Sequence, residues 1–597
     1  MKLRLPSLDQ VAAGARDAVL RFPGPVLAAL LATAAAFRLI ADSSGEPEDP
    51  VLRLLLPALL ALPLGVAGTV ALERRRVGAS APLGGLAIAA LVIPLYWLGF
   101  PGWSDTIRAT RFAQLAILFH LLVACLPFLR REEPNAFWQF NRRILERWLL
   151  GFIYSAALFF GLALALLALD QLFGLDVPDK TYARLWVLMA LSFHPLFFLA
   201  GVPRDLEALE ADRSWPGGLR AFARFVLVPL TAIYLLILTA YFIKVVATGQ
   251  WPSGWIGWLV SGAAAVGILT LLLSSPPATR GEVPWAVLFE KWFWPALLPA
   301  AVMVALAIWK RIDQYGLTER RYFLAALTVW LGVTALAFTF KRRRGLIFIP
   351  ATLALIAAVT FLGPWGAYGA SERSQFRRLT ALLESLGALR DGRITAVAEG
   401  VDADAGGQAA NVVRYLVSTH GPRPVVEWLA ARDFVVGDLP PDTTRYHGAQ
   451  EQRIIAALGL EGLDRMGQGM IWVNRGGQPA VAVTGWDWLV PLRMRHPGDS
   501  TWPGGDSLAA RLGADQRSVE VRRGGALVAG IPIDEALDTL AAWRRRVPSG
   551  DAPDTLMEAG AANGAALVRF RQVGMQDSLG AWRATQVEGE VLVKAER

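Results

Sequence analysis

Between two long apolar segments lies the charged sequence Lys310-Arg311-Ile312-Asp313-Gln314-Tyr315-Gly316-Leu317-Thr318-Glu319-Arg320-Arg321-Tyr322. Charged groups are costly in hydrocarbon, so a charged connection between two apolar segments must lie at a membrane face. The chain as a whole is apolar, because 54% of its 597 residues are hydrophobic and its mean hydropathy is +0.40. These values predict a membrane protein with several spans, and the length predicts at least one further domain.

Apolar segments recur along the first part of the chain. A helix that crosses a bilayer needs about 20 mostly apolar residues. Eleven segments approach that length, namely residues 23–41, 51–72, 81–100, 112–129, 148–173, 185–202, 222–247, 255–275, 293–309, 323–340 and 346–363. We therefore predict an α-helical polytopic membrane bundle of about 11 spans over residues 23–369, followed by a soluble α+β domain over residues 370–597.

Lysine and arginine are unevenly distributed among the predicted loops. Cytoplasmic loops of membrane proteins carry an excess of both residues. If residues 1–22 form a cytoplasmic N-terminal segment, the inner segments hold 22 basic residues and the outer loops hold 8. This bias places the N-terminus in the cytoplasm and, after eleven spans, places residues 370–597 in the periplasm or the extracellular space.

Charge and hydropathy occur together in this sequence. Residues 1–370 contain 33 lysines and arginines against 22 acidic residues, and they are also the apolar part of the chain. The basic residues interrupt apolar segments and form no separate basic domain. They are typical of cationic loops at a membrane face, and they argue against a nucleic-acid partner.

The character of the sequence changes after Gly363. The residues Pro364-Trp365-Gly366 end the last predicted span, and leucines then recur at helical spacing over residues 371–390. Beyond this helix we predict helices over residues 405–418, 424–432, 448–458 and 534–546. We predict strands over residues 470–474, 480–484, 488–494, 518–522, 526–530, 566–572 and 591–594. Glycine-rich turns predict two hairpins, which pair the first two and the fourth and fifth of these strands.

Standard catalytic and metal-binding patterns are absent from the sequence. Cys125 is the only cysteine, which excludes a disulfide within the chain and a cysteine-based metal site. The sequence has no Walker phosphate loop, no His-Glu-x-x-His and no Gly-x-Ser-x-Gly. We therefore predict no cofactor and no metal, and we favour a non-enzymatic protein over an enzyme.

Ionisable groups deep in an apolar span are candidates for function. His120 and His194 lie near the middle of their spans. Either each is a neutral structural histidine, or the two form a proton-relay or ligand pair, which requires their helices to touch. Asp170 and Lys244 lie near the outer ends of their spans, where both side chains can reach the interface. An ion pair between them is the alternative.

The charged sequence at 310–322 is an exception to the charge bias, because it places four basic residues in an outer loop. One interpretation is contact with anionic lipid headgroups. The other is a docking surface for the C-terminal domain or for an anionic envelope partner. The sequence leaves both open for the candidate residues Arg311, Asp313, Tyr315, Glu319, Arg320 and Arg321.

The stretch from Arg311 to Tyr322 also resembles the signature of the DUF4153 family, bacterial membrane proteins of unknown function. Two further stretches support the resemblance: Phe193-His-Pro-Leu-Phe-Phe-Leu-Ala-Gly-Val-Pro203 and Gly363-Pro-Trp-Gly-Ala-Tyr-Gly-Ala-Ser-Glu-Arg-Ser-Gln375. The resemblance covers the membrane part and fades after about residue 440. It implies a multi-pass protein of the bacterial inner membrane, and it carries over no activity and no catalytic residues.

Two functions remain open at this point. The first is a non-enzymatic scaffold, sensor or transporter that couples the helical bundle to an extracytoplasmic domain, with the lipid bilayer and an envelope protein or glycan as partners. The second is a membrane-embedded enzyme that acts on lipid or envelope glycan, with carboxylates that converge near Asp170, Asp313 and Glu319. A polar cavity at the outer face favours an enzyme or a transporter, and a polar path to His120 and His194 favours transport.

Overall fold

The fold is taken from a computed structural model of the chain. It describes residues 8–41, 50–75, 80–99, 105–249, 256–276, 279, 281–340, 345–361, 363–398, 401–439, 448–461, 470–475, 483, 485–494, 508–513, 515–523, 526–546, 552–561, 564–578 and 581–594. The chain divides into two compact units, Met1–Ser374 and Gln375–Arg597. The predicted strand over residues 480–484 lies almost wholly outside the described residues.

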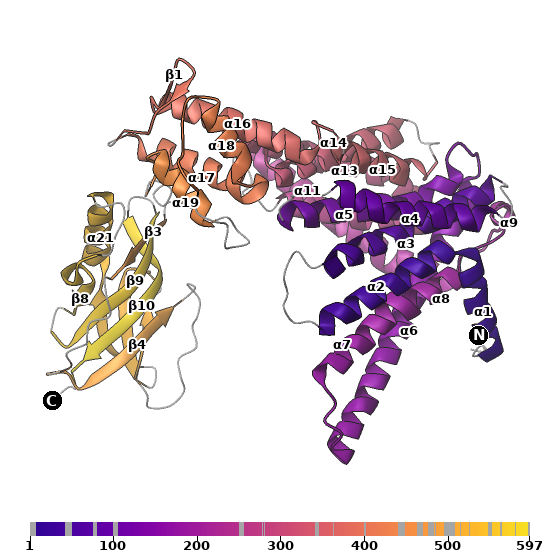
Figure 1. The fold of residues 1–597 in the computed structure, drawn as a ribbon, viewed down its shortest axis with the longest axis horizontal. Coiled ribbons are helices and arrows are strands. Elements are labelled where there is room, and N and C mark those ends of the chain that lie inside the picture. The colour runs from indigo at the N-terminus through magenta and orange to yellow at the C-terminus, as the bar shows by residue number, and fades with distance from the viewer. Residues whose placement is uncertain are drawn as a thin grey trace. The chain divides into compact units, whose positions relative to one another are not determined.

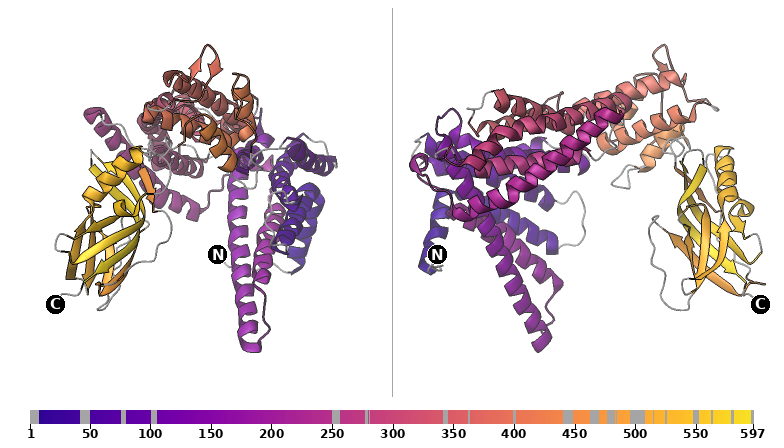
Figure 2. Two further views of the ribbon diagram at one scale, coloured as in Figure 1. Left: turned by 60° about the vertical axis from the view of Figure 1, so that its left-hand side comes forward. Right: turned by 180° about the vertical axis from the view of Figure 1, so that it is seen from behind.

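The first unit is built from helices, which Figures 1 and 2 show from three sides. In chain order they are α1 (Leu8–Arg21), α2 (Pro23–Ala41), α3 (Pro50–Arg74), α4 (Ala81–Gly99), α5 (Asp105–Cys125), η2 (Leu126–Phe128), α6 (Pro134–Phe173), α7 (Asp179–Leu188), η3 (Met189–Phe193), α8 (His194–Ala200), α9 (Ala208–Ala211), α10 (Gly217–Phe222), η4 (Ala223–Leu227), α11 (Val228–Thr248), α12 (Ile256–Ser274), α13 (Pro284–Tyr315), α14 (Glu319–Phe340) and α15 (Phe348–Phe361). The helix α16 (Ala367–Ser385) begins in the first unit and ends in the second.

Length and apolar composition identify the membrane-spanning helices. Among the described residues, nine helices are long and apolar enough to cross a membrane. Every one of the eleven predicted spans corresponds to a helix, but the apolar parts of α4 and α15, Ala81–Tyr96 and Phe348–Phe361, are shorter than the rest. A multi-span helical protein is therefore confirmed, and the count of eleven is not.

Small residues allow α2, α3 and α4 to pack closely. A Cβ atom on Gly24 would lie 2.8 Å from the Leu86 Cα atom, and one on Gly85 would lie 1.8 Å from Thr69 Oγ1. Because lipid tails are as apolar as leucine, helices in a bilayer associate through such close van der Waals packing rather than through a hydrophobic driving force. Many large side chains elsewhere point outward instead; Phe160 and Leu164 on α6, for example, are 68% and 67% exposed.

Aromatic side chains fill the core of the helical unit around α13. Phe293 and Trp294 are almost fully buried, and the Trp294 ring stacks on Phe338 with centroids 5.1 Å apart. Such rings remove large apolar areas and hold α13 against α14. Figures 1 and 2 show that α6 and α7 run together away from the layer that α3, α4 and α5 form.

The second unit contains a helical layer and β-sheets. Its helices are α17 (Ala403–His420), α18 (Pro422–Ala430), α19 (Gly448–Ala457) and α21 (Asp534–Arg546). Its strands are β1 (Leu389–Arg390), β2 (Arg393–Ile394), β3 (Met470–Asn474), β4 (Trp488–Met494), β5 (Leu508–Leu512), β6 (Ser518–Arg523), β7 (Ala526–Pro532), β8 (Glu558–Gly560), β9 (Ala566–Ser578) and β10 (Ala581–Val593). One sheet has the order β3-β9-β10-β4 with β8 beside β9, and another has the order β5-β6-β7.

The predicted helices and strands of this unit agree with the structure in most places. The hairpin of residues 518–522 and 526–530 is confirmed as the antiparallel pair β6 and β7. The strand at 470–474 is also confirmed, but the neighbour that the structure describes for it is β9. Leu379 and Leu383 of α16 are fully buried in the core that α17, α18 and α19 share.

Candidate functional site

The charged sequence at 310–322 does not form the loop that we predicted. Helix α13 continues to Tyr315 and α14 begins at Glu319, so only three residues connect them. Gly316 has a φ of 68°, a conformation that favours glycine, and its N–H donates to the Ile312 carbonyl at 2.9 Å. The charges therefore lie on helix ends around a sharp turn, because the glycine ends one helix and permits the next to begin almost at once.

This turn is held by the first turns of α16 and by Trp365 just before that helix. The Leu317 N–H donates to Ser374 Oγ at 2.9 Å, and the Ser371 hydroxyl donates to the Glu319 carboxylate. The Tyr322 hydroxyl donates to the Trp365 carbonyl at 2.8 Å. We call residues 315–322 together with residues 365–374 the junction. It joins two of the three stretches on which the family resemblance depends.

The candidate residues of the 310–322 sequence divide into two groups. Arg321 donates to the Tyr315 and Gly316 carbonyls at 3.0 and 2.7 Å, and Glu319 accepts from Ser371. These residues brace the turn itself. Arg311, Asp313 and Arg320 are instead exposed on the helix ends. The second group lies on the surface of the helical unit.

The two intramembrane histidines have separate partners. The His120 ring nitrogen Nδ1 lies 2.7 Å from the Ala116 carbonyl of its own helix, on an exposed face of α5. His194 Nε2 lies 3.1 Å from the Trp148 carbonyl on α6. Among the described residues, no hydrogen bond joins the two imidazoles, and each has the backbone partner expected of a structural histidine.

His194 occupies an irregular part of its helix. The residues Met189–Phe193 form a π-helical turn immediately before it. Pro195 follows, and since proline has no N–H and its ring clashes with the preceding turn, the regular hydrogen-bond ladder cannot pass through it. The π turn resolves that conflict locally, and it places the His194 ring against Trp148 with centroids 5.7 Å apart.

Asp170 and Lys244 also have structural surroundings. The Asp170 carboxylate accepts the Val177 N–H at 2.8 Å and so stabilises the turn between α6 and α7. Lys244 is exposed on α11. Across the part of the chain that the structure describes, no ion pair links the two side chains.

A second polar cluster lies where α6 meets α9 and the turn after it, and sequence reasoning missed it. The Asn135 side-chain amide donates to the carbonyls of Leu209, Glu210 and Asp212 at 2.7 to 3.0 Å. One turn later the Gln139 amide donates to the carbonyls of Asp212 and Ser214, each at 2.9 Å. Two side-chain amides thus bond the backbone carbonyls at the end of α9 and in the turn that follows it.

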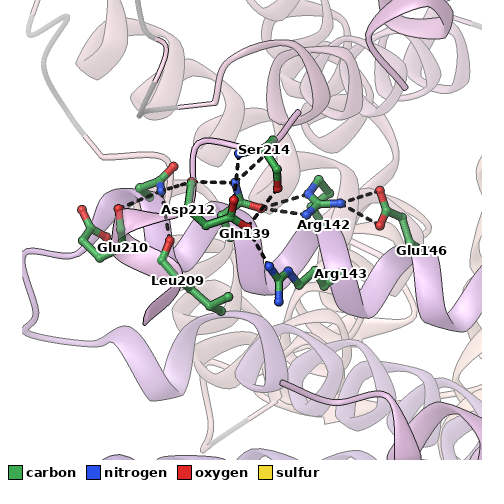
Figure 3. Close-up of polar contacts among 9 residues, drawn as sticks. Gln139, Arg142, Arg143, Glu146, Leu209, Glu210, Asp212 and Ser214 are labelled. Carbon is green, nitrogen blue, oxygen red and sulfur yellow. Dashed lines mark hydrogen bonds and ion pairs between the residues drawn. The ribbon is translucent and has the colours of Figure 1, made fainter. Parts of the chain in front are cut away.

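Charged side chains extend this cluster along α6, as Figure 3 shows. Arg142 donates to the Gln139 side-chain oxygen from Nε and Nη2, and to the Glu146 carboxylate at 2.7 Å. Arg143 pairs with Asp212 at 2.6 Å. Arg142 is 7% exposed, and a buried guanidinium is tolerated only when acceptors surround it. We call these α6 residues and residues 209–214 the α6 network.

Asp212 closes the turn that precedes α10. Its carboxylate accepts the Ser214 N–H at 2.8 Å and the Ser214 hydroxyl at 2.9 Å, in addition to Arg143. Desolvation raises the pKa of Asp212, but the hydrogen bonds from Ser214 and from Arg143 outweigh it and hold the pKa below its ordinary range. The carboxylate is therefore ionised at neutral pH.

Further ion pairs lie near this end of the helical unit. Arg21 at the end of α1 pairs with Glu73 at 2.8 Å and donates to the Val202 and Pro203 carbonyls. Arg74 at the end of α3 pairs with Glu133, which precedes α6. All of these residues belong to the segments that the charge bias places in the cytoplasm. Some of the arginines that produce the charge bias thus also form ion pairs between the predicted inner segments.

An apolar cavity of about 410 Å³ lies between α5, α6, α12, α14 and α15. Its wall includes Leu121, Leu145, Leu269, Leu327, Trp330 and Leu353. Asn141 and Arg142 on α6 also line it, and they are the strongest polar groups of the wall. The cavity therefore has a chemistry suited to a long apolar ligand with a polar end.

Comparison with known proteins agrees with this architecture. The sequence pattern of the family described as "Domain of unknown function (DUF4153)" matches residues 26–375, which is more than half of the chain. The chain belongs to the DUF4153 family. The matched region ends at the second turn of α16, so it includes the whole junction. The second unit lies almost entirely beyond the DUF4153 match.

One relative of this DUF4153 chain is "Uncharacterized protein PM1469" from Pasteurella multocida (strain Pm70). The two are 23% identical over 352 residues, which cover 57% of this chain and 56% of the relative. The chain thus spans about half the length of that relative. No solved structure matches the chain.

Metal chemistry finds no support among the described residues. Within the ranges given above, no group of three or more histidine, cysteine, aspartate or glutamate side chains is arranged to hold a metal ion.

The sequence contains only a weak indication of the α6 network. Asn135 and Gln139 stand four residues apart at the start of a long apolar helix, where amides facing one side indicate a partner segment.

Proposed function

We propose that this DUF4153 chain is a non-enzymatic sensor or scaffold of the bacterial inner membrane, which transmits a change in its helical unit to a C-terminal unit outside the cytoplasm. The observation that carries the proposal is the division of α16 between the two units. Its first two turns are bonded to the junction, through Ser371 and Ser374. Its later turns bury Leu379 and Leu383 in the core of the second unit.

The division of α16 between the two units matters because helix formation is cooperative. A helix is costly to nucleate and cheap to extend, so the loss of its first turns makes the remaining turns fray more readily. A movement at the α13–α14 turn that released Ser371 and Ser374 would therefore weaken the helix that supplies Leu379 and Leu383 to the second core. The junction is in this sense the point at which a membrane event would reach the C-terminal unit.

Orientation and location follow from the charge bias. The 22 basic residues of the predicted inner segments, against 8 in the outer loops, favour a cytoplasmic N-terminus and a periplasmic or extracellular second unit. The junction then lies at the outer face. Arg320 of the junction and the neighbouring Arg311 and Asp313 of α13 are exposed, and they would be accessible there to lipid headgroups or to an anionic envelope protein or glycan.

The alternatives gain less from the structure. The carboxylates of the enzyme hypothesis have separate surroundings, because Asp170 stabilises a turn, Asp313 is exposed and Glu319 accepts from Ser371. The transport hypothesis needs a polar path to His120 and His194, whereas the cavity described above is apolar and neither histidine lines it. Coupling of the helical unit to the second unit through α16 is the hypothesis that agrees with the observed contacts.

Hydrogen exchange of the full-length protein in lipid nanodiscs tests this proposal. We expect the double variant Ser371→Ala/Ser374→Ala to increase amide exchange in residues 379–386 by about tenfold, because loss of about 1.4 kcal/mol of local stability corresponds to that factor. The matched control is Ser385→Ala, which removes a hydroxyl from the same helix whose bond goes only to Leu382. Equal exchange in the double variant and the control would contradict the coupling.

A further inference from the structure

The cavity between α5, α6, α12, α14 and α15 is partly open at its surface, and it is much larger than the gaps that imperfect packing leaves. Protein interiors contain few voids larger than a water molecule. An engineered cavity of roughly 150 Å³ already binds benzene and stays dry when its wall is apolar. The present cavity has a volume of about 410 Å³ and a wall that is apolar apart from a few side chains. Its natural occupant is a larger apolar group than benzene.

The dimensions of the cavity match one leaflet of a bilayer. Along α12 its wall runs from Ser261 to Leu273. At 1.5 Å per residue this corresponds to about 18 Å. The hydrocarbon core of a bilayer is about 30 Å thick, so one leaflet contributes about 15 Å. A single acyl chain that lies along α12 would fill this length.

The amide and the charged group of the wall lie toward one end. Trp138 Nε1 donates to the Leu272 carbonyl at 2.6 Å, which fixes the start of α6 beside the end of α12. Asn141 and Arg142 follow Trp138 by about one turn, so they lie at this same end, while Ser261 lies at the other. A ligand with one polar head and an apolar tail has this polarity, and a wholly apolar ligand does not.

The ion pair at that end of the cavity indicates the chemistry of the ligand's polar head group. Arg142 is 7% exposed and lines the cavity, whereas its partner Glu146 is 39% exposed. The neighbouring wall residues Leu145 and Leu269 are 42% and 40% exposed, so the cavity opens beside the pair. A guanidinium donates N–H bonds to phosphate oxygens, and a carboxylate accepts N–H bonds from a primary ammonium. The pair as a whole is neutral and therefore complements a zwitterion better than an anion.

From these observations we propose that the cavity binds one acyl chain of a phosphatidylethanolamine molecule, with the phosphate at Arg142 and the amine at Glu146. The lipid enters from the leaflet that contains the α6 network. This site lies apart from the junction, and it assigns a specific ligand to the helical unit whether or not the unit transmits a signal through α16.

Native mass spectrometry of the full-length protein tests the assignment. The protein is taken from nanodiscs of equal parts phosphatidylethanolamine, phosphatidylglycerol and phosphatidylcholine, and the lipid retained by each chain is identified. We expect the wild type to retain one phosphatidylethanolamine per chain. Retention of phosphatidylglycerol in its place, or of no lipid, would overturn the proposal.

Two variants test the cavity itself. Ala265 lines the cavity and is exposed toward it, so Ala265→Phe fills the space that the chain would occupy. We expect the bound fraction to fall at least tenfold. Ala232→Phe adds the same side chain at an exposed position of α11 outside the cavity and should retain the lipid. If Ala265→Phe does not fold, Ser261→Phe fills the far end with the same expected loss. A folded cavity variant that retains the lipid fully would overturn the proposal.

A third variant tests the head. Glu146→Gln keeps an acceptor for Arg142 but removes the negative charge that faces the amine. We expect this variant to retain a lipid and to lose the preference for phosphatidylethanolamine over phosphatidylcholine, whose trimethylammonium group cannot donate a hydrogen bond. An unchanged preference would show that Glu146 does not recognise the amine and would overturn that part of the assignment.

Discussion

The junction and the α6 network are both polar clusters of the helical unit, and they are built in opposite ways. At the junction and the adjoining end of α13, charged side chains such as Arg320 and Arg311 are exposed, and small polar groups make many of the contacts. In the α6 network two side-chain amides hold residues 209–214, and the buried Arg142 donates to one of these amides and to Glu146. A charged sequence therefore does not by itself identify the side chains that stabilise the fold.

The two clusters also lie at opposite ends of α13. Trp138 ties the start of α6 to the end of α12, and α13 begins a short segment later. Helix α13 then runs 32 residues to the junction, and a helix of that length extends about 48 Å. If α13 crosses the membrane in the orientation proposed above, the α6 network lies at the inner face and the junction lies at the outer face.

The largest effect should come from the α6 network. Gln139→Leu removes two donated and two accepted hydrogen bonds, so that the Ser214 carbonyl loses its amide donor and the buried Arg142 guanidinium loses the acceptor of two of its N–H groups. We expect a loss of about 2–4 kcal/mol in the free energy of unfolding. Reversible unfolding in mixed micelles measures it.

The control for that prediction stands in the same helix. Gln171→Leu makes the same change near the far end of α6, where Gln171 is exposed and its contact to Asp170 is 3.4 Å long. We expect it to change the free energy of unfolding by less than about 0.5 kcal/mol, as surface substitutions usually do. If both variants lost the same stability, the α6 network would not be the structural cluster described here.

A smaller effect is expected at the junction. Tyr322→Phe removes only the hydroxyl that donates to the Trp365 carbonyl. The expected loss is about 0.5–1.5 kcal/mol, the net value of one ordinary hydrogen bond. Thermal unfolding of the variant beside Tyr234→Phe, an exposed tyrosine of α11, measures it. A loss as large as that of Gln139→Leu would remove the contrast between the clusters.

The smallest effect depends on pH. Because the folded-state pKa of Asp212 is lowered, its carboxylate stabilises the fold above the unfolded pKa of about 3.9, and that contribution is lost as the pH falls through the folded pKa. Asp212→Asn should therefore cost about 1 kcal/mol or less at pH 7.

The measurement is the stability difference between wild type and Asp212→Asn across the acidic range. That difference should shrink as the pH falls below about 3.9 and disappear when the carboxyl group is protonated in both states. A difference that stays constant down to the lowest accessible pH would mean that the Asp212 charge does not contribute.

The sequence predicted the positions of helices and strands better than it predicted which of them pair with one another. Apolar runs located every predicted span, and the alternating burial of Val519 and Val521 fits the predicted strand over residues 518–522. The polar first half of β10 was missed, because residues 581–590 have few apolar residues, and their pairing with β9 and β4 supplies the stabilisation that local propensity lacks.

The candidate site was predicted only in part. Residues 310–322 were singled out correctly as a distinctive stretch, but the predicted loop is too long. Because Gly316 permits a sharp turn, only three residues separate the end of α13 from the start of α14. Asn135 and Gln139 were missed because their role comes from carbonyls about 75 residues away in the chain, and no local pattern indicates such partners.

The account rests most directly on the two clusters facing opposite sides of one membrane. Two single-cysteine variants on a Cys125→Ser background test this, Ala211→Cys beside the α6 network and Gln314→Cys beside the junction, since both positions are exposed. An impermeant maleimide added to cells with a permeabilised outer membrane should label Gln314→Cys, and it should label Ala211→Cys only after the inner membrane is opened. Labelling of both variants from the same side would contradict the account.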